Sequence, residues 1–321
     1  MFDVITFGSA TRDIIIRPKK LTSLQYKKTG DRQICFPLGS KIDIDEIYSN
    51  SGGGGTNTAA TFANQRLKTA FCGVVGNDLE GQEVITELKK LRVDTRFITK
   101  SNQKPTNHSI VILEGDIDRT ILTYRGAAEL LSYIQIPLAK LNTKWLYLAP
   151  LTGPLCESFK GLVEFAHENH IKLAVNPSMA QLSLSNFSQL AQQIDVLIMN
   201  EEEASFLTKI PPEKEQEVFA ALDAMCPGIA VMTKGADGVV VSDNTTIYSA
   251  KPYSGLKIID TTGAGDAFGS GFVAELARSN NIEKAIQLGM ANSAGCISAI
   301  GAKNGLLKKD QLFKKVDVIK R

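Results

Sequence analysis

Hydrophobic residues follow two patterns along the chain, irregular short runs at first and a regular alternation later. Residues 4–7 form an apolar run that predicts a strand ending at Gly8, and residues 13–16 form a second β-prone run. After residue 140, predicted strands alternate with helical segments of about 10–15 residues. This alternation is typical of βαβ units, so the sequence predicts an α/β fold with a parallel sheet.

The individual elements can be placed from the same pattern. Strands are predicted at residues 70–75, 145–149, 171–175, 196–199 and 229–233, helices at 56–67, 155–168, 213–225, 266–278 and 282–300, and a hairpin at 238–249. Two segments, 17–51 and 106–124, are irregular and rich in β-prone runs. Because no repeat, linker or composition shift interrupts the chain, we expect a single domain over residues 1–321 that carries a smaller β element.

Charge and composition exclude several classes of protein. Lysine plus arginine, 36 residues, nearly balance 34 acidic residues, which argues against a nucleic-acid binder, since phosphate recognition needs a concentrated basic face. Seven cations against two acidic residues lie between 303 and 321, and we interpret them as the solvated face of a C-terminal helix.

The sequence also bears on the location of the protein. No apolar run reaches the about 18–20 residues of a membrane span. The N-terminal residues do not read as a signal peptide. Five scattered cysteines fit a reducing, cytoplasmic setting.

The strongest chemical signal is a glycine turn followed by a helical segment. Residues 258–272 read IIDTTGAGDAFGSGF, an apolar entry, a turn and a helical exit. This order places consecutive unpaired backbone N–H groups at a helix N-terminus, which forms an anion site. The site is not a Walker A loop, because the chain has no Gly-Lys dipeptide. The spacing of Gly263, Gly265 and Gly269 also departs from the dinucleotide-binding fingerprint.

Two polar residues beside glycines are candidates for chemistry. Asp266 directly follows the turn, where it is either a helix cap or, beside a bound phosphate, the general base that accepts the proton of an acceptor hydroxyl. Asn57 follows four glycines at 52–55, where it either contacts ligand hydroxyls or caps a helix after a flexible hinge. The residues alone leave both alternatives open.

The two glycine clusters resemble the signatures of the ribokinase family of carbohydrate kinases, also called the phosphofructokinase-B type. Residues 260–268 (DTTGAGDAF) are similar to its C-terminal signature, and residues 52–57 (GGGGTN), with 73–81 (GVVGNDLEG), are similar to its N-terminal one. The resemblance covers essentially the whole chain. It implies a three-layer α/β/α fold and a small β-sheet lid, formed by about residues 13–50 and 104–125, that closes over a sugar.

The resemblance also implies roles on the acceptor side of the site. Asp266 matches the catalytic base, and the anion hole corresponds to the backbone of Gly263, Ala264 and Gly265. Contacts to the sugar are implied for Asp13, Gly53 and Asn57. Arg125, in the second lid segment, is either a further substrate contact or a surface arginine at the end of a strand.

A second set of implied roles concerns the nucleotide and cations. The residues that match positions near ATP are Asn200, Glu203, Thr233, Gly235 and Asn292. Glu203 is expected to act on Mg²⁺ through water. Asp260 and Thr262 correspond to a monovalent-cation site found in many members, which implies K⁺ as a further cofactor beside ATP and Mg²⁺.

These observations together predict an ATP-dependent kinase that phosphorylates a hydroxymethyl group of a small sugar. Gly54 stands where ribokinase carries a lysine, so the substrate stays open. A nucleoside kinase, with Phe36 against the base, and a sugar-phosphate kinase, with Lys41 or Arg125 near the acceptor, are the alternatives. The apolar residues 34–38 also suggest that the lids of two protomers pack together as a homodimer.

Overall fold

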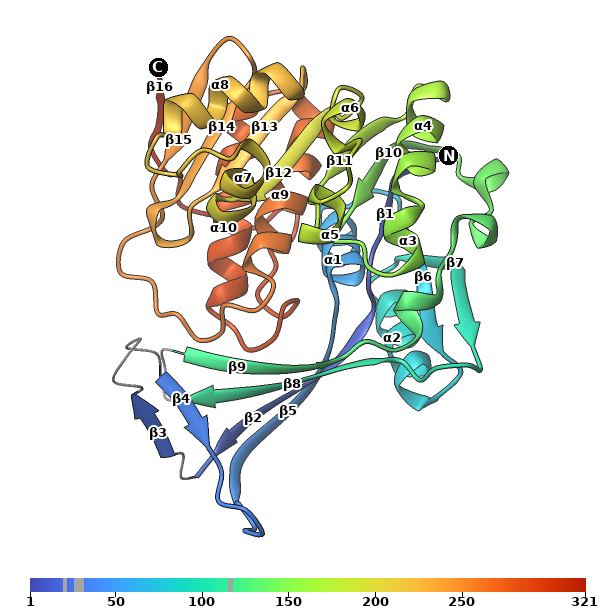
Figure 1. The fold of residues 1–321 in the computed structure, drawn as a ribbon, viewed down its shortest axis with the longest axis vertical. Helices are drawn as coiled ribbons and strands as arrows, with labels where there is room; N and C mark the ends of the chain where they lie inside the picture. The colour runs from blue at the N-terminus through green and yellow to red at the C-terminus, as the bar shows by residue number, and fades with distance from the viewer. Residues whose placement is uncertain (20–21, 26–31, 115–117) are drawn as a thin grey trace.

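A large, mainly parallel sheet forms the centre of the molecule (Figure 1). The computed structural model describes residues 1–19, 22–25, 32–114 and 118–321. The strands of the central sheet are, in spatial order, β16 (Val318–Lys320), β15 (Ile247–Ala250), β14 (Val239–Ser242), β13 (Ile229–Thr233), β12 (Val196–Asn200), β11 (Lys172–Val175), β10 (Thr143–Leu148), β1 (Phe2–Phe7), β6 (Thr69–Gly76) and β7 (Asp94–Ser101). The strands from β13 to β7 pair in parallel, whereas β14, β15 and β16 add an antiparallel edge.

Helices cover both faces of this sheet because successive strand residues point to opposite sides. On one face, Val4 packs with Phe62, Phe268 and Phe272. Those aromatic rings come from α1 (Gly54–Asn64) and α9 (Ala264–Ser279), beside which lie α10 (Ile282–Ile297) and α2 (Leu79–Lys90). On the other face, Ile5 belongs to a second core. That core is covered by α3 (Pro154–Glu157), α4 (Phe159–Glu168), α5 (Met179–Leu182), α6 (Phe187–Ala191), α7 (Glu201–Thr208) and α8 (Glu215–Met225). The predicted three-layer α/β/α arrangement is therefore confirmed.

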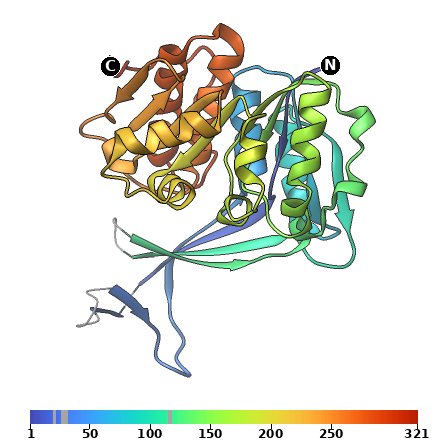
Figure 2. The ribbon, with the colours of Figure 1, turned by 45° about the horizontal axis from the view of Figure 1, so that its top comes forward.

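A smaller sheet projects from one end of this body (Figure 2). Its strands, in order, are β5 (Ile44–Gly52), β2 (Thr11–Pro18), β8 (Asn107–Glu114) and β9 (Asp118–Tyr124). β2 pairs antiparallel with β5 and parallel with β8, and β8 pairs antiparallel with β9. A separate hairpin is formed by β3 (Thr22–Gln25) and β4 (Arg32–Cys35). Since β2 follows β1 and β5 leads into α1, the base of the small sheet lies at the carboxyl end of β1.

The two faces of the small sheet differ in exposure. Ile15, Val111 and Leu113 are buried on the face that also carries Asp13. The opposite face exposes Ile47 to 67%, Ile110 to 37% and Leu122 to 53%. This alternation follows from the period of two in a strand and directs Asp13 toward the body of the protein.

Two predictions of local structure are wrong. The helix predicted at 155–168 is divided into α3 and α4 at Ser158, whose hydroxyl donates to the carbonyl of Pro154 at 2.9 Å. Residues 303–321 form no helix, and their last segment instead pairs with β15 as the edge strand β16.

The segment after α10 begins with a glycine turn of its own. Gly301 has a φ of 82°, in the left-handed region that favours glycine. Among the described helices, none has the length and apolar content that a membrane crossing needs.

Candidate active site

The glycine turn opens α9 as its sequence predicts. Gly263 is the N-cap with φ 78°, and a side chain there would overlap Ala302, so glycine is required at this position. Asp260 shapes the turn, because its carboxylate accepts from the N–H of Thr262 and of Gly301, each at 2.9 Å. The first N–H groups of a helix have no partner within it. The turn therefore presents backbone donors suited to an anion.

A cavity of about 540 Å³ lies beside this turn. Four residues predicted to contact nucleotide or phosphate line it, namely Thr233, Gly235, Ala264 and Gly265. The rest of its wall is largely apolar and includes Leu256, Ile258, Phe268, Met290 and Ile297. An apolar cavity with an anion turn at one side suits a ligand with a flat base and a phosphate chain.

Asn292 was predicted to lie beside the adenine, but the structure does not bring it to this cavity. It is fully buried, and its Nδ2 donates to Ala267 O at 2.7 Å and to Thr61 Oγ1 at 3.1 Å. Its Oδ1 accepts from the N–H of Leu307 at 2.8 Å. The side chain thus ties α10 to α1, while the next residue, Ser293, lines the cavity.

Asn200 and Glu203 begin α7 at the carboxyl end of β12. They form a capping box in which Asn200 Oδ1 accepts from the N–H of Glu203, and Glu203 Oε2 accepts from the N–H of Asn200, each at 2.8 Å. Asn200 lies directly opposite Thr233 in the sheet register. Burial raises the pKa of Glu203, and the backbone bond to Asn200 opposes that rise. Asn200 thus both caps α7 and lies opposite Thr233, which lines the cavity beside the glycine turn.

Asp266 and Asn57, two residues predicted for the acceptor side, meet in the structure. Asn57 Nδ2 donates to Asp266 Oδ2 at 2.9 Å, which joins the starts of α1 and α9. Asn57 is 5% exposed, and its Oδ1 is buried without a hydrogen-bond partner in the described structure. Burial raises the pKa of Asp266, whereas the bond from Asn57 and the charge of Lys303 oppose the rise. An unpaired acceptor next to a carboxylate is suited to a ligand hydroxyl.

Asp13 and Gly53 lie close to the start of α1, where the sequence predicts sugar contacts. Gly53 has φ 95°, and a Cβ there would lie 2.5 Å from Ser9 O, so only glycine fits. The carboxylate of Asp13 lies against Gly52, since a Cβ on Gly52 would be 2.6 Å from Asp13 Cγ. Burial raises the pKa of Asp13, which is 7% exposed. Arg125, by contrast, is exposed after the end of β9.

Lys303 is a buried charged residue that the sequence analysis placed wrongly. It was assigned to an exposed helix face, but its side chain is only 6% exposed. Its Nζ donates to Ser51 Oγ at the end of β5 and lies 3.7 Å from Glu87 Oε1 of α2. The sequence contains one weak signal that Lys303 is buried. Lys303 lies between Ala302 and Asn304, in a short segment with glycines at 301 and 305, and it is separated in sequence from the other cations of the C-terminal region.

The predicted monovalent-cation residues can be tested against the geometry. Thr262 Oγ1 is buried and has no hydrogen-bond partner in the described structure. Both oxygens of Asp260 accept backbone N–H groups, so this carboxylate would take part in cation binding only in addition to those bonds. The orphaned hydroxyl oxygen fits a hard cation such as K⁺, which prefers oxygen donors.

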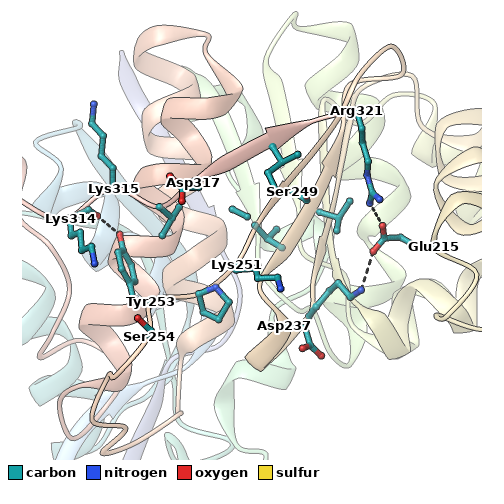
Figure 3. Close-up of a pocket in the computed structure, with 17 residues that line it drawn as sticks. Glu215, Asp237, Ser249, Lys251, Tyr253, Ser254, Lys314, Lys315, Asp317 and Arg321 are labelled. Atoms are coloured by element: carbon teal, nitrogen blue, oxygen red, sulfur yellow. Dashed lines mark hydrogen bonds and ion pairs between the residues drawn. The ribbon is translucent and has the colours of Figure 1, made fainter.

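A second cavity, of about 500 Å³, lies at the antiparallel edge of the central sheet (Figure 3). Lys234 lines it, although Thr233 and Gly235 on either side line the cavity beside the glycine turn. Its charges are partly paired, since Glu215 binds Lys234 at 3.0 Å and also contacts Arg321 (Figure 3). None of the residues predicted for the active site lines this second cavity.

The fold and the glycine turn define a class of phosphate-handling α/β protein, and comparison with known proteins identifies the family. Residues 1–309 match the pfkB family of carbohydrate kinases, so the chain belongs to this family and is a carbohydrate kinase, a phosphotransferase. It is 30% identical over 260 residues to the ribokinase of Haemophilus influenzae, covering 79% of this chain and 83% of that protein.

Two further relatives bear on substrate and fold. The adenosine kinase of Schizosaccharomyces pombe is 26% identical over 307 residues, covering 88% of this chain and 90% of that one. The Arabidopsis thaliana ribokinase, solved with ribose and ATP, has a TM-score of 0.78 at 21% identity over 96% of each chain. The fold expected from the sequence is thereby confirmed.

Proposed function

We propose that this protein transfers the γ-phosphate of ATP to a hydroxymethyl group of a small, uncharged sugar, with Asp266 as the general base. The acceptor oxygen forms a bond to the γ-phosphorus while the bond between that phosphorus and the β,γ-bridging oxygen breaks. The hydroxyl proton passes to the Asp266 carboxylate, and ADP leaves with the electron pair of the broken bond. The backbone N–H groups of Gly263, Ala264 and Gly265 would stabilise the charge on the transferred phosphate.

The observation that carries this proposal is the position of Asp266. It follows Ala264 and Gly265, which line the nucleotide cavity, and it accepts a hydrogen bond from Asn57 on the acceptor side. A base between the phosphate donor and the acceptor hydroxyl is what a direct transfer requires. Asp13, Gly53 and the unpaired Oδ1 of Asn57 would bind sugar hydroxyls, and the small sheet would close over the sugar as a lid and exclude water.

Cation roles belong to the same proposal. Glu203 Oε2 is engaged in the helix cap, and Glu203 Oε1 would hold a water of Mg²⁺. When bound, Mg²⁺ neutralises phosphate charge. Thr262 Oγ1 and Asp260 would contribute to a K⁺ site beside the turn. The five cysteines are all free thiols, and a reducing cytoplasm is the compartment we propose.

The experiment that tests this function is an ADP-release assay with ATP and a panel of acceptors. Ribose, fructose, ribose 5-phosphate, a keto-deoxy acid and adenosine should be compared at equal concentration, with Asp266→Asn as the matched inactive variant. We expect the highest turnover with an uncharged sugar. Preference for adenosine would instead support the nucleoside-kinase alternative, which the Schizosaccharomyces pombe relative makes a real candidate. Preference for ribose 5-phosphate would support a sugar-phosphate kinase, although Lys41 and Arg125 are both exposed.

We also propose a homodimer in which the outer faces of two lids pack together. Besides Ile47, Ile110 and Leu122, this face exposes Tyr124 to 47%, and Phe36, which follows β4 of the separate hairpin, is 44% exposed. An apolar face of this kind is typical of a protein interface. Sedimentation of the wild type and of Leu122→Glu tests the proposal. A wild type that stays monomeric at all concentrations would contradict it.

A further inference from the structure

A third cavity, of about 760 Å³, is lined by the carboxyl ends of α1 and α2 and by residues 308–311 of the segment after α10. All three elements contribute cations to this basic cavity, namely Arg66, Lys90, Arg92, Lys308 and Lys309. Of the described residues in its wall, only Asp310 is acidic, and it pairs with Arg66 at 2.5 Å. In the described part of the chain, no acidic side chain forms an ion pair with the other four cations. The basic cavity therefore has an excess of positive charge.

The two lysines are fixed at the basic cavity by the packing of their segment. The carbonyl of Leu307 accepts from Gln65 Nε2 at 2.9 Å, and Leu307 is 5% exposed. The N–H of Lys309 donates to the carbonyl of Asn64, the last residue of α1, at 3.0 Å. Lys308 and Lys309 are thus held beside the end of a helix that is distant from them in the sequence.

Both arginines occupy a backbone position that glycine usually fills. Arg66 and Arg92 follow the C-caps of α1 and α2, and their φ values are 60° and 64°. A side chain is disfavoured in this left-handed conformation, so glycine is the common residue there. Cations near a helix C-terminus also complement the helix dipole. That effect does not account for Lys308 and Lys309, which belong to no helix.

We propose that the basic cavity is a binding site for a small anion that carries several phosphate groups. Arginine and lysine are the side chains that bind phosphate, arginine through two parallel hydrogen bonds. A single phosphate group would contact only some of the five cations, so a polyphosphate matches the site better. The volume of the cavity is that of a small-molecule site. A nucleic acid would instead need an extended basic face, and the nearly balanced charge of the chain argues against one.

The basic cavity is separate from the candidate active site. Asn57 lies in the first turn of α1, whereas Arg66 follows the other end of this helix. A helix of 11 residues is about 16 Å long. None of the residues predicted for the active site lines the basic cavity. The inference therefore goes beyond the proposed function and does not depend on it.

The test is calorimetric titration with myo-inositol hexakisphosphate, a polyphosphate without a nucleotide base. We expect one ligand per chain in the wild type, and an affinity about tenfold lower in Arg92→Gly and in Lys90→Met, because each loses a charged partner of a phosphate. Lys89→Met is the matched control. Lys89 is exposed in the same last turn of α2 and does not line the cavity, so its affinity should stay within about twofold of wild type.

Arg92→Gly also separates binding from folding. Glycine adopts the φ of 64° more easily than arginine does, so the Tm of this variant should be unchanged or higher while its affinity falls. If Arg92→Gly lowers Tm, Lys90→Met decides, because its backbone is an ordinary helical one.

Three results would overturn the inference. The first is a wild type that shows no saturable binding. The second is an equal loss of affinity in Lys89→Met and Lys90→Met, which would show a response to net charge alone. The third is binding that is lost in Gly263→Ala but kept in Arg92→Gly and Lys90→Met, which would place the anion at the glycine turn.

Discussion

The contact between Gly52 and Asp13 offers a test of the acceptor site that leaves the base and the nucleotide cavity untouched. Gly52 ends β5 with a backbone that any residue can adopt, so Gly52→Ala introduces one methyl group without backbone strain. The three atoms nearest to that Cβ all belong to the carboxylate of Asp13, and Cγ would be only 2.6 Å away. The carboxylate must therefore move.

The size of the effect follows from this geometry. Ordinary contact begins near 3.4 Å, and Asp13 Oδ2 lies closer to that Cβ than Cγ does, so the Asp13 carboxylate is displaced by more than about 1 Å. A hydrogen bond to a charged group contributes about 1.5–3 kcal/mol, and losing it for a sugar hydroxyl lowers kcat/KM by about 10- to 150-fold. Overpacking should also destabilise the fold by about 1–3 kcal/mol.

A double-mutant cycle gives the decisive assay. kcat/KM for the acceptor and the denaturation midpoint are measured for Gly52→Ala, Asp13→Ala and the double variant. Because the three atoms nearest to the methyl group all belong to Asp13, Gly52→Ala should cost almost nothing once Asp13 is alanine. ADP affinity, measured by calorimetry, should be unchanged throughout. Fully additive effects, or a single variant within twofold of wild type, would refute the reasoning.

Three other changes probe the site. Asp266→Asn should lower kcat by about 10²- to 10⁴-fold while ADP affinity is retained, and turnover near the wild-type value would exclude Asp266 as the base. For Asp13, burial raises the pKa of the carboxyl in the folded protein above its unfolded value of about 3.9. The protonated carboxyl therefore stabilises the fold at pH values below the unfolded pKa, and this stabilisation is lost as pH rises through the folded-state pKa. Wild type should therefore lose thermal stability relative to Asp13→Asn as pH rises from 4 to 7, and a constant Tm difference would contradict this. Gly263→Ala forces a side chain against Ala302 at positive φ, and kcat/KM for ATP should drop at least about tenfold. An unchanged value in that variant would show that the turn does not bind phosphate.

The local features of the fold could be predicted because their causes lie within a few residues. The turn at 260–268 needs glycine at Gly263, whose φ is 78°, and Asp266 follows it in the first turn of α9. The strand and helix alternation after residue 140 likewise reflects short-range periodicity and is present in the structure. Asn200 and Glu203 could also be foreseen as the start of a helix, since a capping box is a contact between neighbours in sequence.

What only the tertiary structure decided depends on residues far apart in the chain. Asn292 and Ser293 are adjacent on α10, yet they lie on different sides of the helix. Asn292 is buried in the core, and Ser293 lines the cavity beside the glycine turn. Lys303 looks like one of seven cations in a basic tail, and only packing against Ser51 of β5 and Glu87 of α2 buries it. The sequence by itself determined the glycine turn and the class of fold, because backbone conformation and periodicity are local. The charge balance around Asp13 and Asp266 required the folded chain, because electrostatic interactions depend on distance in space and on burial.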